Sequence, residues 1–308
     1  MCCVNGPYFL NTIYVWKKRM KITDQFASGR PNLSFEIYPP KHDSQISDIT
    51  ATLDVLAELR PDFISVTFGA GGSANNNRTI ELSRRIKDEY GIEPLVHLTC
   101  LCYSKAEIDD FLMQLRDNGL GNILALRGDR RDGVAEKNDF PHASDLIRYV
   151  RKTQGSQFCI AGACYPECHP QSADRVQDIR ALVQKTEAGA QLLISQLFFE
   201  NSMFTSFIEN CRIAGIDVPV CAGIMPVINR NQIEKMVTLC GASLPDRFAK
   251  IVSKYDGNRE ALFDAGLAYA VSQIIDLCAN GFEYIHLYTM NNPAVARRIA
   301  EGVKHIIR

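Results

Sequence analysis

The sequence predicts an α/β protein with the architecture of a (β/α)8 barrel. Short apolar runs rich in β-branched residues alternate with longer amphipathic segments from residue 33 onward. The runs are continuous rather than alternating in polarity, which is typical of parallel strands that are covered on both faces. Eight such units within about 275 residues match the usual size of this barrel.

Eight apolar runs are the expected strands. In chain order they are 33–38, 63–67, 94–100, 123–127, 158–165, 192–198, 219–225 and 284–290. A doubly wound sheet is the alternative, but that fold normally carries a glycine-rich dinucleotide motif after its first strand. Here the first run ends in Tyr38-Pro39-Pro40-Lys41 instead, so we favour the barrel.

The segments between the runs have helical spacing and marked ends. One apolar face is formed in each of three segments by Ile46, Ile49, Leu53 and Leu56, by Ile108, Phe111, Leu112 and Leu115, and by Val295, Ile299, Val303 and Ile306. Pro61, Gly91 and Gly119 indicate turns from helix to strand. Asn291-Asn292-Pro293 is typical of a capped helix start with proline in the first turn.

One interval between expected strands is too long for a single helix. About 58 residues separate the seventh run from the eighth, with helical stretches at 233–239, 245–255 and 258–280. We therefore expect extra helices inserted before the last strand. Because no linker or repeat divides the chain, we expect residues 21–308 to form a single domain.

Residues 1–20 differ from the rest and are expected to be a disordered arm or the product of a start assigned too early. The apolar stretch from Tyr8 to Trp16 precedes Lys17, Lys18 and Arg19, whereas a secretory signal places its charges first. The stretch is also shorter than the roughly 20 apolar residues that a membrane-spanning helix needs.

Composition argues for an ordinary globular protein that acts on small molecules. Hydrophobic residues make up 46% of the 308 residues and charged residues 22%, with a formal net charge of −1. Such a balance provides no general field for nucleic acid or an anionic membrane, so we expect neither as a partner. The eleven cysteines include no CxxC pair, which indicates a reduced, cytoplasmic protein.

Polar residues stand near the ends of six expected strands, where the active site of a barrel lies. They are Glu36, Thr67, His97 with Thr99, Arg127 with Asp129, Tyr165 with Glu167 and His169, and Gln196. A single polar residue at a strand end is usually a cap or a solvated group. Repetition on six strands favours a shared functional site.

Glu36 is the strongest catalytic candidate. It lies between Phe35 and Ile37, and a carboxylate in an apolar strand is costly unless it is neutralised, paired or used. Burial would favour the protonated form and make Glu36 a plausible general acid. The alternative is a structural salt bridge to Lys41 or to an arginine of a neighbouring strand.

Three further motifs have less specific interpretations. The glycine-rich turn at 68–73 would allow backbone to approach a ligand closely, and no P-loop lysine follows it. The pair Arg127 and Asp129 is either a surface ion pair or a site for an anionic ligand and a polar ring. The segment Tyr165-Pro166-Glu167-Cys168-His169-Pro170 matches no standard zinc spacing, so we expect no metal.

Collinear blocks of this sequence resemble the methylenetetrahydrofolate reductase family. The resemblance runs from about Ser34 to the C-terminus. Within the family, the sequence is similar to the bacterial type, which consists of the catalytic barrel without a regulatory domain. The blocks that carry it are Phe35-Glu36-Ile37-Tyr38-Pro39-Pro40-Lys41, Ser65-Val66-Thr67-Phe68-Gly69-Ala70, His97-Leu98-Thr99-Cys100, Ala125-Leu126-Arg127-Gly128-Asp129, Tyr165-Pro166-Glu167-Cys168-His169-Pro170, Ala188-Gly189-Ala190, Gln196-Leu197-Phe198-Phe199, Gly223-Ile224-Met225-Pro226-Val227 and Leu287-Tyr288-Thr289-Met290-Asn291.

The resemblance implies an FAD-dependent oxidoreductase of one-carbon metabolism, on the route to methionine. NADH or NADPH would reduce FAD and leave, and 5,10-methylenetetrahydrofolate would then take the hydride in the same site and become 5-methyltetrahydrofolate. Glu36 matches the general acid that protonates folate N10. Asp129 matches the carboxylate beside the flavin and the pterin, where it would favour hydride donation and stabilise a cationic iminium.

The resemblance also implies the binding residues. FAD would be contacted by Thr67, Phe68, Ala70, His97, Arg127, Gly128, Asp129, His142, Ala143, Tyr165, His169, Asp178 and Lys185. Arg127 and Lys185 would neutralise its pyrophosphate, and Gln196 and Gln232 would contact the substrate. Partners would be the nicotinamide and folate together with a second copy of the chain in a homo-oligomer.

Four positions depart from the family pattern. Ala181 and Gln184 stand where the family has Asn and Arg, Asn292 stands where it has an arginine for the folate tail, and Phe68 replaces a tyrosine. These departures leave room for a flavin-holding subunit that receives electrons from a partner protein. A different flavin barrel, such as a proline dehydrogenase-like oxidase, is disfavoured by the segments around Glu36 and Gln196.

Overall fold

The computed structural model describes residues 20–26, 29–40, 45–68, 73–130 and 135–307. Eight parallel strands follow one another around a closed barrel in chain order, and the last strand pairs with the first. The predicted (β/α)8 barrel is therefore confirmed. The strands are β1 (Asn32–Ile37), β2 (Phe63–Val66), β3 (Glu93–Thr99), β4 (Asn122–Leu126), β5 (Cys159–Cys164), β6 (Leu192–Ser195), β7 (Val220–Ile224) and β8 (Tyr284–Tyr288).

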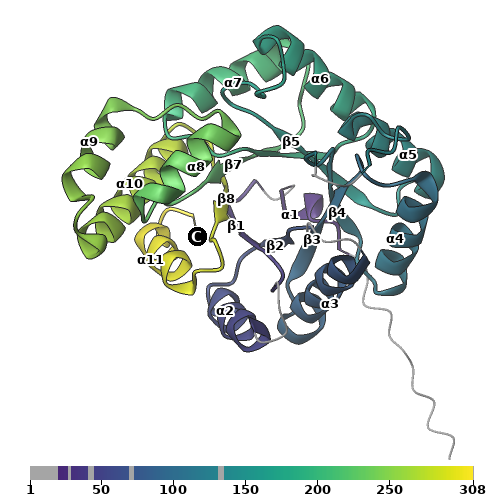
Figure 1. Cartoon of the computed structure of the whole chain (residues 1–308), viewed down its shortest axis with the longest axis horizontal. Helices are drawn as coiled ribbons and strands as arrows, with labels where there is room; N and C mark the ends of the chain where they lie inside the picture. The colour runs from purple at the N-terminus through teal and green to yellow at the C-terminus, as the bar shows by residue number, and fades with distance from the viewer. Residues whose placement is uncertain (1–19, 27–28, 41–44, 69–72, 131–134, 308) are drawn as a thin grey trace, which may run out of the picture.

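Helices alternate with the strands and, apart from the short first helix, form a ring around them (Figure 1). Each of the first seven strands is followed by a helix that returns the chain to the opposite end of the barrel, as parallel pairing requires. The helices are α1 (Thr23–Phe26), α2 (Ile46–Glu58), α3 (Ser73–Tyr90), α4 (Lys105–Asp117), α5 (Ala143–Gln154), α6 (Arg175–Glu187), α7 (Asn201–Ile213), α8 (Arg230–Cys240), α9 (Asp246–Tyr255), α10 (Arg259–Ala279) and α11 (Pro293–Val303).

The strand register determines which side chains enter the barrel. Leu33, Phe35 and Ile37 belong to the apolar cluster that packs under the helices. Because side chains alternate along a strand, Ser34 and Glu36 point to the inner face of β1. Glu36 therefore lies on a polar inner line rather than within an apolar one.

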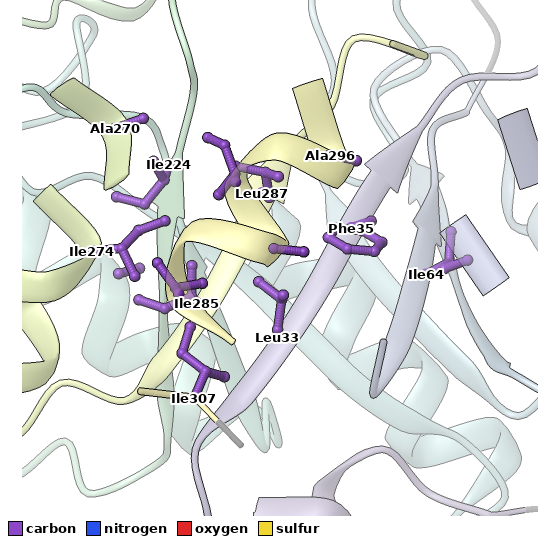
Figure 2. Close-up of a cluster of buried hydrophobic side chains, with 14 of the residues drawn as sticks. Leu33, Phe35, Ile64, Ile224, Ala270, Ile274, Ile285, Leu287, Ala296 and Ile307 are labelled. Atoms are coloured by element: carbon purple, nitrogen blue, oxygen red, sulfur yellow. The ribbon is translucent and has the colours of Figure 1, made fainter. Parts of the chain in front are cut away.

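The main core lies between the strands and their outer helices. Figure 2 shows Leu33 and Phe35 of β1 and Ile285 and Leu287 of β8 facing Ile274 and Ala296 of α10 and α11. All six side chains are buried. This packing closes the barrel at the seam between its first and last strands.

The inserted helices predicted before the last strand are α8, α9 and α10, which lie together at one side of the barrel (Figure 1). α10 has the length and hydropathy of a membrane-spanning helix. It instead packs against α7, α9 and α11 and buries residues such as Leu267 and Ile274 in the barrel core. At Gly266 the helix lies so close to the Val227 carbonyl that a Cβ would sit 1.7 Å from that oxygen.

The amino end of the barrel is closed by the segment before β1. Ile22 and Phe26 are buried against inward residues of several strands. The Ile22 amide donates to Asn122 Oδ1 at 3.0 Å, and Asn122 Nδ2 donates to the Met20 carbonyl and to Glu93. Lys87 completes this polar layer with a bond of 2.9 Å to Glu93. Of the predicted arm, residues 1–20, only Met20 lies in the described part of the chain.

Two details of the predicted helices are wrong. Ile46, expected on the apolar face of α2, is 46% exposed because it opens the helix, while Ile49, Leu53 and Leu56 are buried. Ile306 is 38% exposed because α11 ends at Val303, and Ile307 is buried in its place.

The predicted strands also run beyond the observed ends. The run 192–198 is the clearest case, because β6 ends at Ser195. The Phe198 and Phe199 carbonyls accept hydrogen bonds from Gln273 and Tyr269 of α10 rather than from a neighbouring strand. Apolar residues here therefore belong to a buried loop.

Candidate active site

Glu36 lies at the carboxyl end of the barrel beside two histidines. Its Oε2 is 3.5 Å from His97 Nε2 on β3 and 3.9 Å from His286 Nε2 on β8. The Glu36 side chain retains 19% exposure, whereas His286 is fully buried. Among the described residues, Glu36 forms no ion pair with lysine or arginine. The alternative of a structural salt bridge therefore finds no arginine partner for Glu36 among the described residues. Lys41, the other partner considered, lies outside the described residues.

Burial keeps His97 uncharged. Desolvation lowers the pKa of His97 to about 4, against an opposing effect of Glu36 and with a further lowering by His286. Its Nε2 has no hydrogen-bond partner in the described part of the protein. At neutral pH the group facing Glu36 from β3 is therefore a neutral imidazole.

His286 is held in place by its neighbours on the inner faces of β1 and β2. Ser34 Oγ is 2.7 Å from Nδ1 and Ser65 Oγ is 3.1 Å from Nε2. The ring also stacks on Phe63 with 5.6 Å between centroids. Sequence reasoning missed His286, although the spacing Tyr284, His286, Tyr288 places three polar rings on one face of the strand.

The end of β8 is tied to β1 and β6. Tyr288 Oη donates to the Ser195 carbonyl at 2.6 Å, and Thr289 Oγ1 donates to the Glu36 carbonyl at 2.7 Å. Gly223 makes room for the Tyr288 ring, since a Cβ there would lie 2.8 Å from it. Burial, followed by Glu36, raises the pKa of Tyr288 well above its usual value, so the phenol remains protonated.

Two cationic side chains, Arg127 and Lys185, lie near the ends of β4 and β5. Lys185 Nζ donates to the Ala163 carbonyl at 2.7 Å. Burial lowers the pKa of Lys185; Cys164 and Asp178 oppose this effect, and the neighbouring Arg127 adds to it. Arg127 also lies close enough to His169 to lower the pKa of that histidine, after burial and an opposing effect of Asp178. The structure thus brings these predicted cofactor-binding residues together.

Asp129 is exposed and lies beside Tyr165. Burial raises the pKa of Tyr165 to about 12, with further increases from Cys240 and Asp129. The Tyr165 ring meets His169 edge to face, with 4.5 Å between centroids. The predicted positions after β4 and β5 therefore lie near one another.

The predicted residues on β2 and β4 lie next to the strand ends. The Thr67 amide donates to the Ile37 carbonyl at 3.0 Å, and Phe68 packs against Tyr103 and Phe111 rather than toward Glu36. Gly128 has a φ of +83°, and a Cβ there would come within 2.9 Å of Thr99. Ala70 lies outside the described residues.

His142 and Ala143 stand at the start of α5. Ala143 is buried, whereas the His142 side chain is 74% exposed and lies 3.4 Å from Asp145. The recorded side-chain partner of His142 therefore lies in the first turn of its own helix.

The two predicted substrate glutamines stand in different places. Gln196 Oε1 accepts from the Leu197 amide at 2.8 Å, directly after β6. Gln232 lies near the start of α8, where Oε1 accepts from the Ile228 amide and Nε2 donates to the Pro226 carbonyl. Both side chains are partly buried.

The departures from the family pattern can be placed in the structure. Ala181 lies three residues after Asp178 and four before Lys185, on the same face of α6, and offers no polar group there. Gln184 is exposed. Asn292 is the N-cap of α11, and its Oδ1 accepts from the Ala294 and Val295 amides. This confirms the predicted helix start and explains what Asn292 does.

The cysteines of the described part of the chain are not clustered with other potential metal ligands. Nine of them lie in the described ranges and all nine are free. No group of three potential metal ligands occurs in that part of the chain. Cys164, buried beside Lys185, has a pKa raised well above its usual value by burial, so it is an unreactive thiol.

A closed (β/α)8 barrel with a carboxylate, imidazoles and cations at the carboxyl ends of its strands has the arrangement of a barrel enzyme. The family model described as methylenetetrahydrofolate reductase matches residues 21–304. The chain belongs to the methylenetetrahydrofolate reductase family.

Individual relatives agree with this family. The probable methylenetetrahydrofolate reductase (NADH) of Oryza sativa subsp. japonica is 34% identical over 284 residues, covering 88% of this chain and 48% of that protein. The 5,10-methylenetetrahydrofolate reductase of Escherichia coli strain K12 is 32% identical over 273 residues, covering 89% of this chain and 90% of that protein. The chain thus spans about half the length of its plant relatives and most of the length of its E. coli relative.

A solved structure has the same fold. It is described as an uncharacterized protein from Clostridium thermocellum that binds two copies of 5-methyl-5,6,7,8-tetrahydrofolic acid. The TM-score is 0.65, and the match covers 92% of this chain and 99% of that chain. At 13% sequence identity, the likeness concerns the fold alone.

Proposed function

We propose that this chain catalyses the reduction of 5,10-methylenetetrahydrofolate to 5-methyltetrahydrofolate, with FAD as its cofactor and NADH or NADPH as the electron donor. The observation that carries this proposal is Glu36, held at the mouth of the barrel next to two imidazoles and without a cation partner among the described residues. Membership of the family supports the reaction class.

The residues present fit FAD. Arg127 and Lys185 lie within electrostatic range of one another, and Lys185 is held in a partly buried position. Two neighbouring cations are favourable only if an anion compensates them, and a pyrophosphate would do so together with the nearby Asp178. Bound FAD would supply hydride chemistry, accepting a hydride from the nicotinamide and passing it to the folate.

The chain itself would supply the proton. Opening the imidazolidine ring of the folate requires protonation of N10, and Glu36 is the partly exposed carboxyl group at the mouth that can provide it. The neutral His97 faces this carboxyl without placing a positive charge beside it.

Asp129 would act through its charge. It is exposed on the rim beside Tyr165, where a carboxylate stabilises a cationic folate iminium. Gln196 and Gln232 would orient the folate by hydrogen bonds. A homo-oligomer in the cytoplasm remains the expected state of the protein.

Anaerobic stopped-flow absorbance of the purified protein tests the proposal. We expect FAD to bind, NADH or NADPH to bleach its absorbance near 450 nm, and methylenetetrahydrofolate to restore it. Failure to bind FAD after reconstitution would contradict the proposal. Flavin that is reduced by dithionite and reoxidised by the folate, but not reduced by either nicotinamide, would instead indicate a subunit served by a protein electron donor.

A further inference from the structure

Glu167 forms a contact between two loops that the proposed chemistry does not explain. It lies in the loop between β5 and α6, and its Oε2 accepts hydrogen bonds from the Ser243 amide at 2.9 Å and the Ser243 hydroxyl at 2.5 Å. Ser243 follows α8, so the contact joins positions 76 residues apart. Bonds to an ionised acceptor are among the stronger hydrogen bonds in proteins.

Other contacts bring the same two loops together. Gly241 ends α8 in the left-handed conformation, and a Cβ there would lie 3.3 Å from Pro170 Cγ. Ala242 is buried in the apolar cluster under the inserted helices. Cys240 lies near enough to Tyr165 to raise its pKa, second to burial. The C-terminal end of α8 is therefore seated against the β5–α6 loop.

The opposite end of α8 carries Gln232, the expected substrate contact. α8 has 11 residues, so about 16 Å of helix separates its two ends. A helix is a stiff rod, and a change in its seating at one end alters the position of the other. A contact that holds Ser243 in place therefore also restricts the position of Gln232.

The other oxygen of Glu167 argues against a purely stabilising role. Oε1 is buried and has no hydrogen-bond partner among the residues described. Burying an acceptor without a partner lowers the stability of the folded protein. Stability alone therefore does not account for this contact. It is well suited to holding a particular geometry.

We infer that Glu167 is a positioning residue that fastens α8 to the β5–α6 loop and thereby places Gln232 for the folate substrate. This inference rests on the proposed function for its substrate. The expected consequence is selective, because Gln232 is assigned to the folate and not to the nicotinamide.

The test compares Glu167→Ala, Ser243→Ala and their double variant with the wild-type protein. For Glu167→Ala we expect the KM for methylenetetrahydrofolate to rise about tenfold, while the rate constant of flavin reduction by the nicotinamide stays within about twofold. Ser243→Ala should give a smaller rise, and the double variant should resemble Glu167→Ala alone, because both changes break one contact. Glu167→Gln keeps an acceptor for Ser243 and should recover most of the lost affinity.

A matched control exists in the same molecule. Glu107 Oε2 accepts from the Ser104 amide and hydroxyl, both at 2.7 Å, but within one helix start. Glu107→Ala therefore removes a similar pair of bonds, together with the ion pair to Lys137 in the β4–α5 loop, and none of these contacts involves α8. We expect it to leave the folate KM unchanged.

Hydrogen–deuterium exchange of α8 gives a readout that does not depend on activity. We expect α8 peptides to exchange about tenfold faster in Glu167→Ala than in the wild type or in Glu107→Ala, with a smaller increase in Ser243→Ala. An unchanged exchange rate and folate KM would overturn the inference, as would an equal loss of both half-reactions. If the wild type lacks folate activity, the proposed function fails, and the exchange data still decide whether Glu167 fastens α8.

Discussion

The side chains next to Glu36 determine which charges lie beside its carboxyl group. A fixed cation beside a carboxyl favours the ionised form, and such a form cannot donate a proton. Here the nearest titratable partners are His97 and His286, and His97 is neutral because it is buried. His97 therefore places no fixed positive charge beside Glu36.

The buried state of His97 predicts a pH dependence of stability. Its pKa in the folded protein is about 4, below the ordinary value of about 6.5 that it regains on unfolding. The unfolded chain therefore binds more protons between these values, and the free energy of unfolding falls as the pH drops through this window. The loss from this group is at most about 3 kcal/mol.

Urea unfolding of the FAD-free protein at several pH values between 4 and 7 measures this effect. Relative to wild type, His97→Gln should flatten the dependence, because the variant has no imidazole to protonate. Parallel curves for the two proteins would show that folding does not lower the pKa of His97.

At the scale of elements, the strands and helices could be predicted because their apolar periods are strong. The polar residues on the inner faces of the strands could not be predicted, because the sequence analysis treats β1 and β8 as continuous apolar runs. In β1 the pattern Ser34, Glu36 alternates with Phe35 and Ile37, and this period of two is the signal that distinguishes inward from outward residues. The neighbours of Glu36 follow from barrel closure rather than from local sequence.

The seating of α10 on the loop after β7 makes Gly266 a sensitive position. Gly266→Ala would place a Cβ against the Val227 carbonyl, so the helix must move away from the barrel. We expect a loss of about 1–3 kcal/mol in the free energy of unfolding. Urea denaturation measures it, and Gly257→Ala is the control because a Cβ there meets nothing within 4 Å. Equal stabilities of the two variants would contradict this packing.

At the scale of the whole molecule, the two ends of the barrel have different tasks. The carboxyl end carries Glu36 and the two cations Arg127 and Lys185, while the amino end is closed by residues 20–26. The eight repeating units could be predicted from the sequence. The contact of Glu36 with His286, separated by 250 residues, could not, because the strand pairing that creates it becomes defined only when the barrel closes.

The sealed amino end predicts a stability effect remote from the site. Asn122→Ala removes the bonds to the backbone of Met20 and Ile22 and the contact with Glu93. Leaving such buried groups without partners should lower the free energy of unfolding by about 1–3 kcal/mol. Asn118→Ala is the control, because Asn118 is only partly buried and its side chain bonds within its own helix end. Equal urea midpoints for the two variants would mean that the seal contributes little.

The central claim is that Glu36 supplies the proton to the folate and has no part in reduction of the flavin. The most direct test is stopped-flow measurement of both half-reactions in Glu36→Gln, which keeps the size of the side chain and removes the acidic proton. We predict that the nicotinamide bleaches the flavin at a rate within about threefold of wild type, while reoxidation by methylenetetrahydrofolate slows by at least about 10²-fold. Reoxidation at the wild-type rate would contradict the claim.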